Sequence, residues 1–301
     1  MAWLLAYLSV CGGAVGCNPI LGFEEGTLSS GVAGAGMGGL GGNGGAAGSG
    51  GAPQGGSGGA PQGGSGGSGG GGCADAYFAE VSADSPVFYL RFAEQDGLAV
   101  HDELGVQGTV GGGVDLDVPP LTACADDSAA RFPGVSTAHV RFGDVLGFGG
   151  KSSFSVEVWL SADALQGMVI RKLAGAPSSG YTLAYYLDEL AFRRYSNGDA
   201  DTVAAASSAV GTWATHHVVG TYDGVAEQMC LYVGGELIEC AASSRDIADG
   251  SGEFMIGTQA FAGAIDEVAV YAAPLSPERI ARHFEIGAAL SSRSGPLRDH
   301  R

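Results

Sequence analysis

The stretch FSVEVWL at residues 154–160 decides the fold, because large apolar side chains occupy every second position. Successive side chains of a β-strand point to opposite faces, so this alternation predicts a strand with one face in a hydrophobic core. Trp159 falls on the other face, together with Glu157. Its ring either stacks on a sugar at the concave surface of a sheet or packs beneath a covering loop.

Similar short apolar runs follow one another along the chain, broken every 8 to 12 residues or so by Gly, Asn and Asp, which is typical of a β-sandwich. The runs that predict strands are 87–92, 138–142, 154–160, 180–187, 190–195, 216–222, 229–233, 254–257 and 264–271. One helix closes the pattern: Ser276 is a suitable N-cap, Pro277 follows it, and Ile280 and Phe284 recur on one side. We therefore predict an all-β sandwich of two antiparallel sheets with a short C-terminal helix.

Charged residues mark where the globular part of the chain begins. All 14 Lys and Arg residues, and all but two of the 32 Asp and Glu residues, lie beyond residue 72. We place one domain at residues 73–290 and a tail at residues 291–301, because a single sandwich or barrel commonly has roughly 200 to 250 residues. The net charge of this part is −16 (14 − 30), which repels phosphate backbones, so nucleic acid is not an expected partner.

Residues 1–16 are predicted to be a signal peptide, because they are almost wholly apolar or small and carry no charge. They are fewer than the roughly 20 residues of a membrane-spanning helix. The sequence AVGC at residues 14–17 resembles a bacterial lipobox, which implies a lipid anchor on Cys17. Asn18 after it implies the outer membrane or cell surface. Acylation at Cys11 and release by an ordinary secretory signal are the alternatives.

Residues 17–72 are predicted to be the anchor segment and a disordered linker. From about Ser30 the sequence is almost entirely Gly, Ala and Ser, and GAPQGGSG occurs at Gly51 and again at Gly59. Without charges or large apolar side chains, such a segment cannot offset the entropy lost on ordering. We therefore expect a flexible spacer between the anchor and the domain.

Disulfides are favoured by the even number of cysteines that an exported domain would contain. These are Cys73, Cys124, Cys230 and Cys240. Cys230 and Cys240 flank a predicted hairpin that turns at Gly234 and Gly235, which favours a cross-strand bridge. That leaves Cys73 to pair with Cys124, and buried free thiols are the alternative.

Three segments resemble the laminin-G-like group of the concanavalin A-like lectin/glucanase jelly rolls, over roughly residues 76–290. The first is residues 154–160. The second is GTWATHHVVGTYDG at 211–224, which leads into LYVGG at 231–235, and the third is FAGAIDEVAVY at 261–271, followed by LSPE. The resemblance implies a jelly roll, and it does not specify a ligand.

The resemblance also raises two kinds of chemistry. Some members are glycoside hydrolases with a Glu-x-Asp-x-x-Glu run on one strand, and this sequence has none. Asp266 and Glu267 are adjacent, so we expect them on opposite faces of a strand and expect no enzymatic activity. The group often binds a structural calcium near the last strand, which implies Asp266 and Asp102 as ligands. Asp102 in a turn is the simpler explanation of that residue.

Candidate ligand-binding residues are aromatic and cationic, since such side chains suit recognition surfaces, although the strands of any sandwich contain aromatics. We select Trp159, Tyr186, Arg194 and Tyr195. A metal or catalytic role for His216 and His217 is not expected, because neighbouring strand residues face opposite ways and no nucleophile motif accompanies them. We expect a noncatalytic module that binds an extracellular glycan or protein; a structural envelope protein and a glycoside hydrolase are the alternatives.

The anchor gives a first testable prediction. Replacement of the predicted lipid acceptor, Cys17→Ala, should abolish acylation and move the protein from the membrane fraction to the soluble fraction. Fractionation and labelling with a fatty-acid analogue measure both effects, with Cys11→Ala as the matched control. Retention of the Cys17 variant on membranes would reject the anchor.

Overall fold

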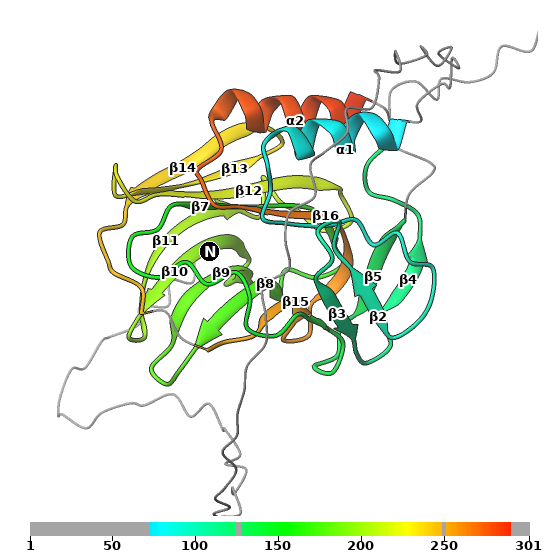
Figure 1. Cartoon of the computed structure of the whole chain (residues 1–301), viewed down its shortest axis with the longest axis horizontal. Coiled ribbons are helices and arrows are strands. Elements are labelled where there is room, and N and C mark those ends of the chain that lie inside the picture. The colour runs from blue at the N-terminus through cyan, green and yellow to red at the C-terminus, as the bar shows by residue number, and fades with distance from the viewer. Residues whose placement is uncertain (1–72, 124–127, 249–250, 290–301) are drawn as a thin grey trace, which may run out of the picture. The chain divides into compact units, whose positions relative to one another are not determined.

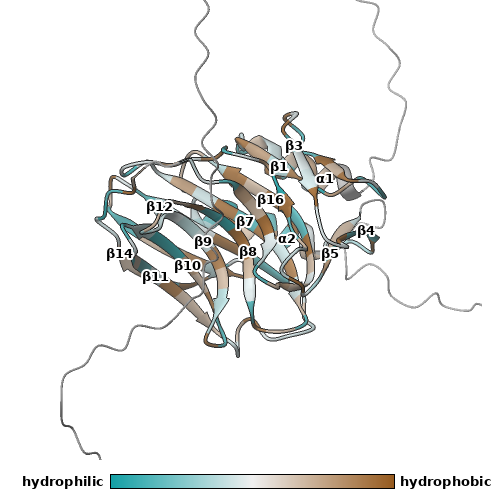
Figure 2. Cartoon of the chain, turned by 90° about the horizontal axis from the view of Figure 1, so that it is seen from below, coloured by the Kyte–Doolittle hydropathy of each residue, from teal (hydrophilic) through white to brown (hydrophobic). Residues whose placement is uncertain are grey.

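The structure is a computed structural model that describes residues 73–123, 128–248 and 251–289. Two antiparallel sheets of eight strands each face one another, and two helices lie on the outer side of one sheet (Figure 1). Hydrophobic and hydrophilic residues are mixed along the strands (Figure 2), as expected where one face of each sheet is buried. The all-β sandwich of two antiparallel sheets is therefore confirmed.

The first sheet carries the helices on its outer face. Its strands, in spatial order, are β14 (Glu236–Ala242), β13 (Gln228–Val233), β12 (His216–Asp223), β7 (Phe154–Ala162), β16 (Ala262–Tyr271), β5 (Ala129–Pro133) and β4 (Asp115–Val118), with β1 (Phe88–Leu90) paired to β16.

The second sheet packs its inner face against the first. Its strands, in spatial order, are β11 (Asp199–Ala206), β10 (Glu189–Ser196), β9 (Ser179–Tyr186), β8 (Gly167–Ala174), β15 (Phe254–Thr258), β6 (Val140–Arg141), β3 (Gln107–Val110) and β2 (Ala99–His101).

Strand β7 lies near the middle of the first sheet, between β12 and β16. Phe154 and Leu160 belong to the core between the sheets, as the alternation predicts. The intervening residues of β7 are also buried, because the helices cover its outer face. β7 is thus enclosed on both sides.

The closing helix, α2 (Pro277–Ala289), agrees with its prediction. The Ser276 hydroxyl accepts a hydrogen bond from the Arg279 N–H at 3.3 Å, which is an N-cap, and Ile280 is buried on the sheet. Gly287 permits a close approach: a Cβ there would lie 2.3 Å from Cζ2 of Trp159. α2 therefore rests directly on the Trp159 ring.

A second helix, α1 (Cys73–Ala83), was not predicted, so the expectation of one helix is wrong. Tyr77 and Val81 are buried against the first sheet, but apolar residues also occupy the other sides of this short helix. The sequence thus lacks the single apolar stripe that identifies a surface helix. Neither helix of the described part of the chain is long and apolar enough to cross a membrane.

Seven strands were also missing from the predicted set: β2, β3, β4, β5, β8, β11 and β14. Most are short, lie near a sheet edge, or contain Ala and Asp, which have low strand propensity. Their pairing partners, rather than their own sequences, define most of them, although β14 is the second strand of the hairpin that the Gly234–Gly235 turn predicts.

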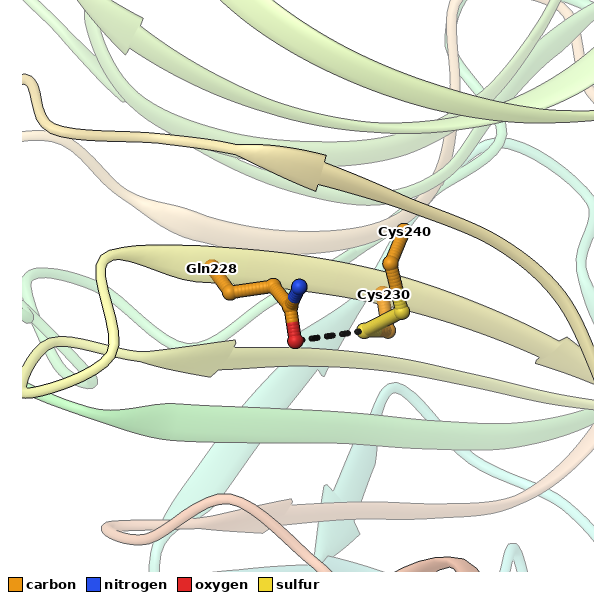
Figure 3. Close-up of a disulfide and its surroundings, with 3 residues drawn as sticks. All are labelled: Gln228, Cys230 and Cys240. Atoms are coloured by element: carbon orange, nitrogen blue, oxygen red, sulfur yellow. Dashed lines mark hydrogen bonds between the residues drawn. A yellow bond between two sulfur atoms is a disulfide. The ribbon is translucent and has the colours of Figure 1, made fainter.

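The predicted bridge between Cys230 and Cys240 is confirmed (Figure 3), with an S–S distance of 1.98 Å across β13 and β14. The hairpin turns at Gly234 and Gly235, which both have positive φ, as predicted. Cys124 lies outside the described residues, as do the side chain of Cys73, the signal peptide, Cys17, the linker and the tail 291–301.

The bridge closes a loop with a sequence separation of 10 residues. Its removal in Cys230→Ser/Cys240→Ser should lower the free energy of unfolding by about 3 kcal/mol, because the unfolded chain regains loop entropy. Urea unfolding measures the change, and the wild type in reducing buffer is the matched comparison. An unfolding free energy that is unchanged in both would contradict the prediction.

Candidate ligand-binding surface

A buried carboxylate, Glu157 of β7, organises the outer face of the first sheet. Its oxygens accept hydrogen bonds from the Tyr77 hydroxyl at 3.1 Å and the Tyr271 hydroxyl at 2.7 Å. They also lie 2.7 Å from Nε2 of His217 and 3.0 Å from Nδ1 of His283. Side chains from α1, β16, β12 and α2 thus meet on one group of β7.

The charges of this cluster are mutually stabilising. Burial alone raises the pKa of the Glu157 carboxyl, but His283 and His217 beside it outweigh burial and hold this pKa well below its usual range. Burial alone lowers the pKa of the His283 imidazole. The carboxylate of Glu157, and that of Asp84, which lies 2.9 Å from Nε2 of His283, outweigh burial and raise this pKa above its usual value. The cluster therefore favours a carboxylate paired with an imidazolium over the two neutral groups.

Trp159 lies inside this covered region and is 3 % exposed. Its Nε1–H donates to the Tyr77 hydroxyl at 2.7 Å, and its ring stacks on Phe284 with 6.0 Å between the ring centroids. It is thus a packing residue beneath two helices and not an exposed platform for a sugar. Of the two alternatives for this ring, covering is correct, although helices rather than a loop provide the cover.

A β-bulge places Asp266 and Glu267 on the same side of β16, so the expectation of opposite faces is wrong. Glu267 has φ 49° and the register with β7 shifts just after Asp266. The Asp266 carboxylate accepts the Leu121 N–H at 2.9 Å, and Glu267 accepts the Tyr89 hydroxyl. Both carboxylates are buried under the covered face, where no substrate reaches them in this conformation.

Asp102 is also buried, and its carboxylate accepts three backbone N–H groups, from Tyr89 at 3.3 Å, Leu104 at 3.1 Å and Val106 at 2.6 Å. The bonds from Leu104 and Val106 hold the turn between β2 and β3, and the bond from Tyr89 joins this turn to β1. Both Asp102 oxygens and both Asp266 oxygens thus accept backbone hydrogen bonds. In the described residues no group of three or more His, Cys, Asp or Glu gathers to hold a metal. Asp102 and Asp266, as they are bonded here, do not form the predicted calcium site. Calcium binding by the protein stays a prediction.

The outer face of the second sheet differs from this covered face, because the helices lie on the opposite side of the sandwich (Figure 1). Tyr186 of β9 is 54 % exposed there. The Arg193 guanidinium lies over its ring, with Cζ 4.2 Å from the centroid. Tyr195, two residues further along β10, is half-buried. A cation and an aromatic ring thus meet on this face.

Arg194 is fully buried, so its selection as a ligand-binding residue is wrong. It shares the parity of Phe192, which lies in the core, and its guanidinium lies over the Tyr222 ring at 3.3 Å. It donates to the carbonyl oxygens of Gly150 and Arg245, both at 3.3 Å. Arg194 holds two loops at the edge of the core, and its neighbour Arg193 faces outward.

Two large, strongly exposed side chains lie at one end of the sandwich. Leu187, in the turn between β9 and β10, is 80 % exposed, and Trp213, in the loop between β11 and β12, is 71 % exposed. Both have positive φ, 51° and 64°, a costly conformation for large side chains that clusters at binding sites. Both segments adjoin the same ends of β10 and β11, where Glu189 pairs with Ala206.

Sequence reasoning missed the buried cluster, Arg193 and Trp213. A glutamate in the middle of an apolar strand, as at Glu157, is itself a signal that partners cover it. The alternation of Leu190 and Phe192 gave the orientation of Arg193. Nothing local identified Trp213, because its exposure depends on where the loop lies.

Comparison with known families places this architecture among the concanavalin A-like jelly rolls. Residues 134–281 match the laminin G model of the concanavalin A-like lectin/glucanases superfamily. This match includes all three quoted segments, so their resemblance to the laminin-G-like group is confirmed. No curated protein matches the sequence.

Solved structures show the same fold at low sequence identity. The binding domain of Paraclostridial Mosquitocidal Protein 1 is 15 % identical, with a TM-score of 0.56 over 67 % of this chain and 52 % of that one. The botulinum neurotoxin serotype D ligand-binding domain, solved in complex with N-acetylneuraminic acid, is 17 % identical, with a TM-score of 0.55 over 69 % and 52 %. This chain thus spans about half the length of these structures.

The raised pKa of His283 predicts a pH dependence. A group whose pKa is higher in the folded protein stabilises the fold fully when the pH is below its pKa in the unfolded chain, about 6.5 for histidine. This stabilisation is lost as the pH rises through the pKa of the folded protein. The free energy of unfolding should therefore fall above about pH 6.5, and His283→Gln should reduce that fall. Urea unfolding across this range measures it, with His216→Gln, outside the cluster, as control. Equal slopes in wild type and His283→Gln would exclude the pair.

Proposed function

We propose that this domain is a noncatalytic recognition module that binds an extracellular glycan or protein. The observation that carries the proposal is the grouping of Tyr186, Leu187 and Trp213, three large exposed side chains, at one end of the sandwich. Exposed aromatic rings of this kind anchor ligands, because they supply large contact area at small entropic cost. Arg193 over Tyr186 adds a hydrogen-bond donor to the same region.

The burial of the carboxylates on the covered face supports a noncatalytic role for that face. Hydrolysis of a glycoside needs two carboxyl groups on either side of the scissile bond. Glu157, Asp266 and Glu267 are buried beneath the helices and hydrogen-bonded there. Their arrangement suits structural burial and not attack on a substrate.

The relatives in structure support a glycan as one class of ligand. A structurally similar toxin domain was solved with N-acetylneuraminic acid, and the matching superfamily is named for lectins and glucanases. Because the fold alone does not confer function, these likenesses only favour the class.

The proposed place of action is the outer membrane or cell surface, reached through the signal peptide and held by a lipid on Cys17. The long Gly-rich sequence that follows supports a spacer that carries the domain away from the anchor. In this arrangement, binding of a ligand by the domain attaches the cell to that ligand.

The test is binding of the full chain in detergent to an array of neutral and acidic glycans printed beside extracellular matrix proteins, with calcium and with chelator. Trp213→Ala and Tyr186→Ala should each weaken binding about tenfold, as expected for an aromatic anchor. Val225→Ala is the matched control, because Val225 is 94 % exposed in the turn between β12 and β13 at the other end. No binding to any spot would overturn the proposal.

A further inference from the structure

A single row of side chains crosses the outer face of the second sheet at right angles to its strands. The residues are directly opposite one another in the pairing register. From β11 to β3 they are Thr202, Arg193, Thr182, Arg171, Met255, Arg141 and Thr109. Their chain neighbours Phe192, Phe254 and Val140 lie in the core, so the row points outward.

The three arginines of this row differ from the other cations. No carboxylate of the described residues lies within 4.0 Å of Arg141, Arg171 or Arg193. Every other Lys or Arg of that part of the chain has such a partner, apart from the buried Arg194. The paired cations are Arg91, Arg131, Lys151, Lys172, Arg245, Arg279 and Arg282.

This pattern is notable in a chain with a net charge of −18. Burial lowers the pKa of Arg171, and the more distant Glu253 opposes that effect only in part. The contacts that the row does make are weak: Arg171 donates to the Met255 sulfur at 3.4 Å, and Arg193 lies over Tyr186. Three positive charges thus remain available on one face.

Polar atoms in the row also lack partners. Thr182 is 0 % exposed between Arg193 and Arg171, and its hydroxyl has no hydrogen-bond partner. The Nε of Arg193 is likewise buried and unpaired. Buried polar atoms are nearly always hydrogen-bonded in native structures. Unpaired donors in the middle of a cationic row therefore point to a ligand that completes them.

The spacing of the arginines indicates the form of this ligand. Adjacent strands lie about 4.8 Å apart, so arginines on alternate strands recur every ~10 Å, over ~20 Å in total. Successive sugars of an extended β-linked polysaccharide turn over, so equivalent groups recur on one side once per disaccharide, a comparable repeat. We propose that the row binds an acidic polysaccharide that has one acid group per disaccharide and lies across the strands. This inference rests on the proposed recognition function.

A polysaccharide fits this surface better than a nucleic acid. A nucleic acid strand carries one phosphate per ~3.4 Å, which is far denser than the row of arginines. Thr202 and Thr109, at the two ends of the row, are exposed and offer hydroxyls to sugar hydroxyls, while the arginines pair with carboxylate or sulfate.

The test uses the full chain in detergent and, as probe, a hyaluronan oligosaccharide with one carboxylate per disaccharide. Arg141→Gln, Arg171→Gln and Arg193→Gln should each weaken binding about tenfold, since each change removes a charge-assisted hydrogen bond to an acid group. Added salt should weaken binding by the wild type. Arg131→Gln is the matched control, because Arg131 pairs with Asp163 outside the row, and thermal unfolding verifies that each variant is folded.

The outcomes separate this inference from the proposed function. Binding of hyaluronan that is lost in the three row variants and kept in Arg131→Gln supports the row. Equal binding by the row variants, binding of neutral glycans or matrix proteins alone, or equally tight binding of single-stranded DNA overturns the inference. Equal binding by the row variants, or binding of neutral glycans or matrix proteins alone, leaves the proposed recognition function intact. Only a chain that binds nothing on the array overturns both the inference and the proposed function.

Discussion

The carboxylate of Glu157 is the constraint on which the covered side of the domain depends. A charged group removed from water costs several kcal/mol unless partners and hydrogen bonds compensate it. Here the compensation comes from four other elements, through Tyr77 of α1, Tyr271 of β16, His217 of β12 and His283 of α2. The two helices at opposite ends of the domain sequence therefore have to meet over the middle of the first sheet. Trp159, which might have faced a ligand, becomes part of their packing surface.

Because the helices close one face, the proposed recognition falls to the other. In the described part of the chain seven of the eleven Lys and Arg residues pair with carboxylates, and the four that do not belong to strands of the second sheet. Because side chains alternate along each strand, the same parity that buries Phe192 and Phe254 turns Arg193 and Met255 outward. The core and the cationic row are two consequences of one pattern.

Features with local causes could be predicted from the sequence, whereas features that depend on distant partners could not. The alternation of residues 154–160, the Gly234–Gly235 hairpin with its disulfide, and the Ser276 cap each have a signal within a few residues. α1 has no distinct apolar stripe, and the bulge at Glu267 has no sequence mark. The candidate site was only partly predictable: Tyr186 is exposed, but Arg194 was chosen for its residue type against its parity. The row crosses β8, β15, β6 and β3, which are not consecutive, so its register appears only in the folded sheet.

The position of α1 has a mechanical consequence. The preceding chain joins the domain at α1, on the outer side of the first sheet, while the proposed ligand lies on the outer side of the second. Tension between an anchored cell and a bound polymer would therefore cross the thickness of the sandwich instead of shearing one strand along another. The first contacts to bear that load are those that clamp α1 to α2, where Arg279 pairs with Glu80 at 2.6 Å and with Asp84 at 2.8 Å. The contacts between α1 and α2, and not the jelly roll itself, would then limit the strength of attachment under flow.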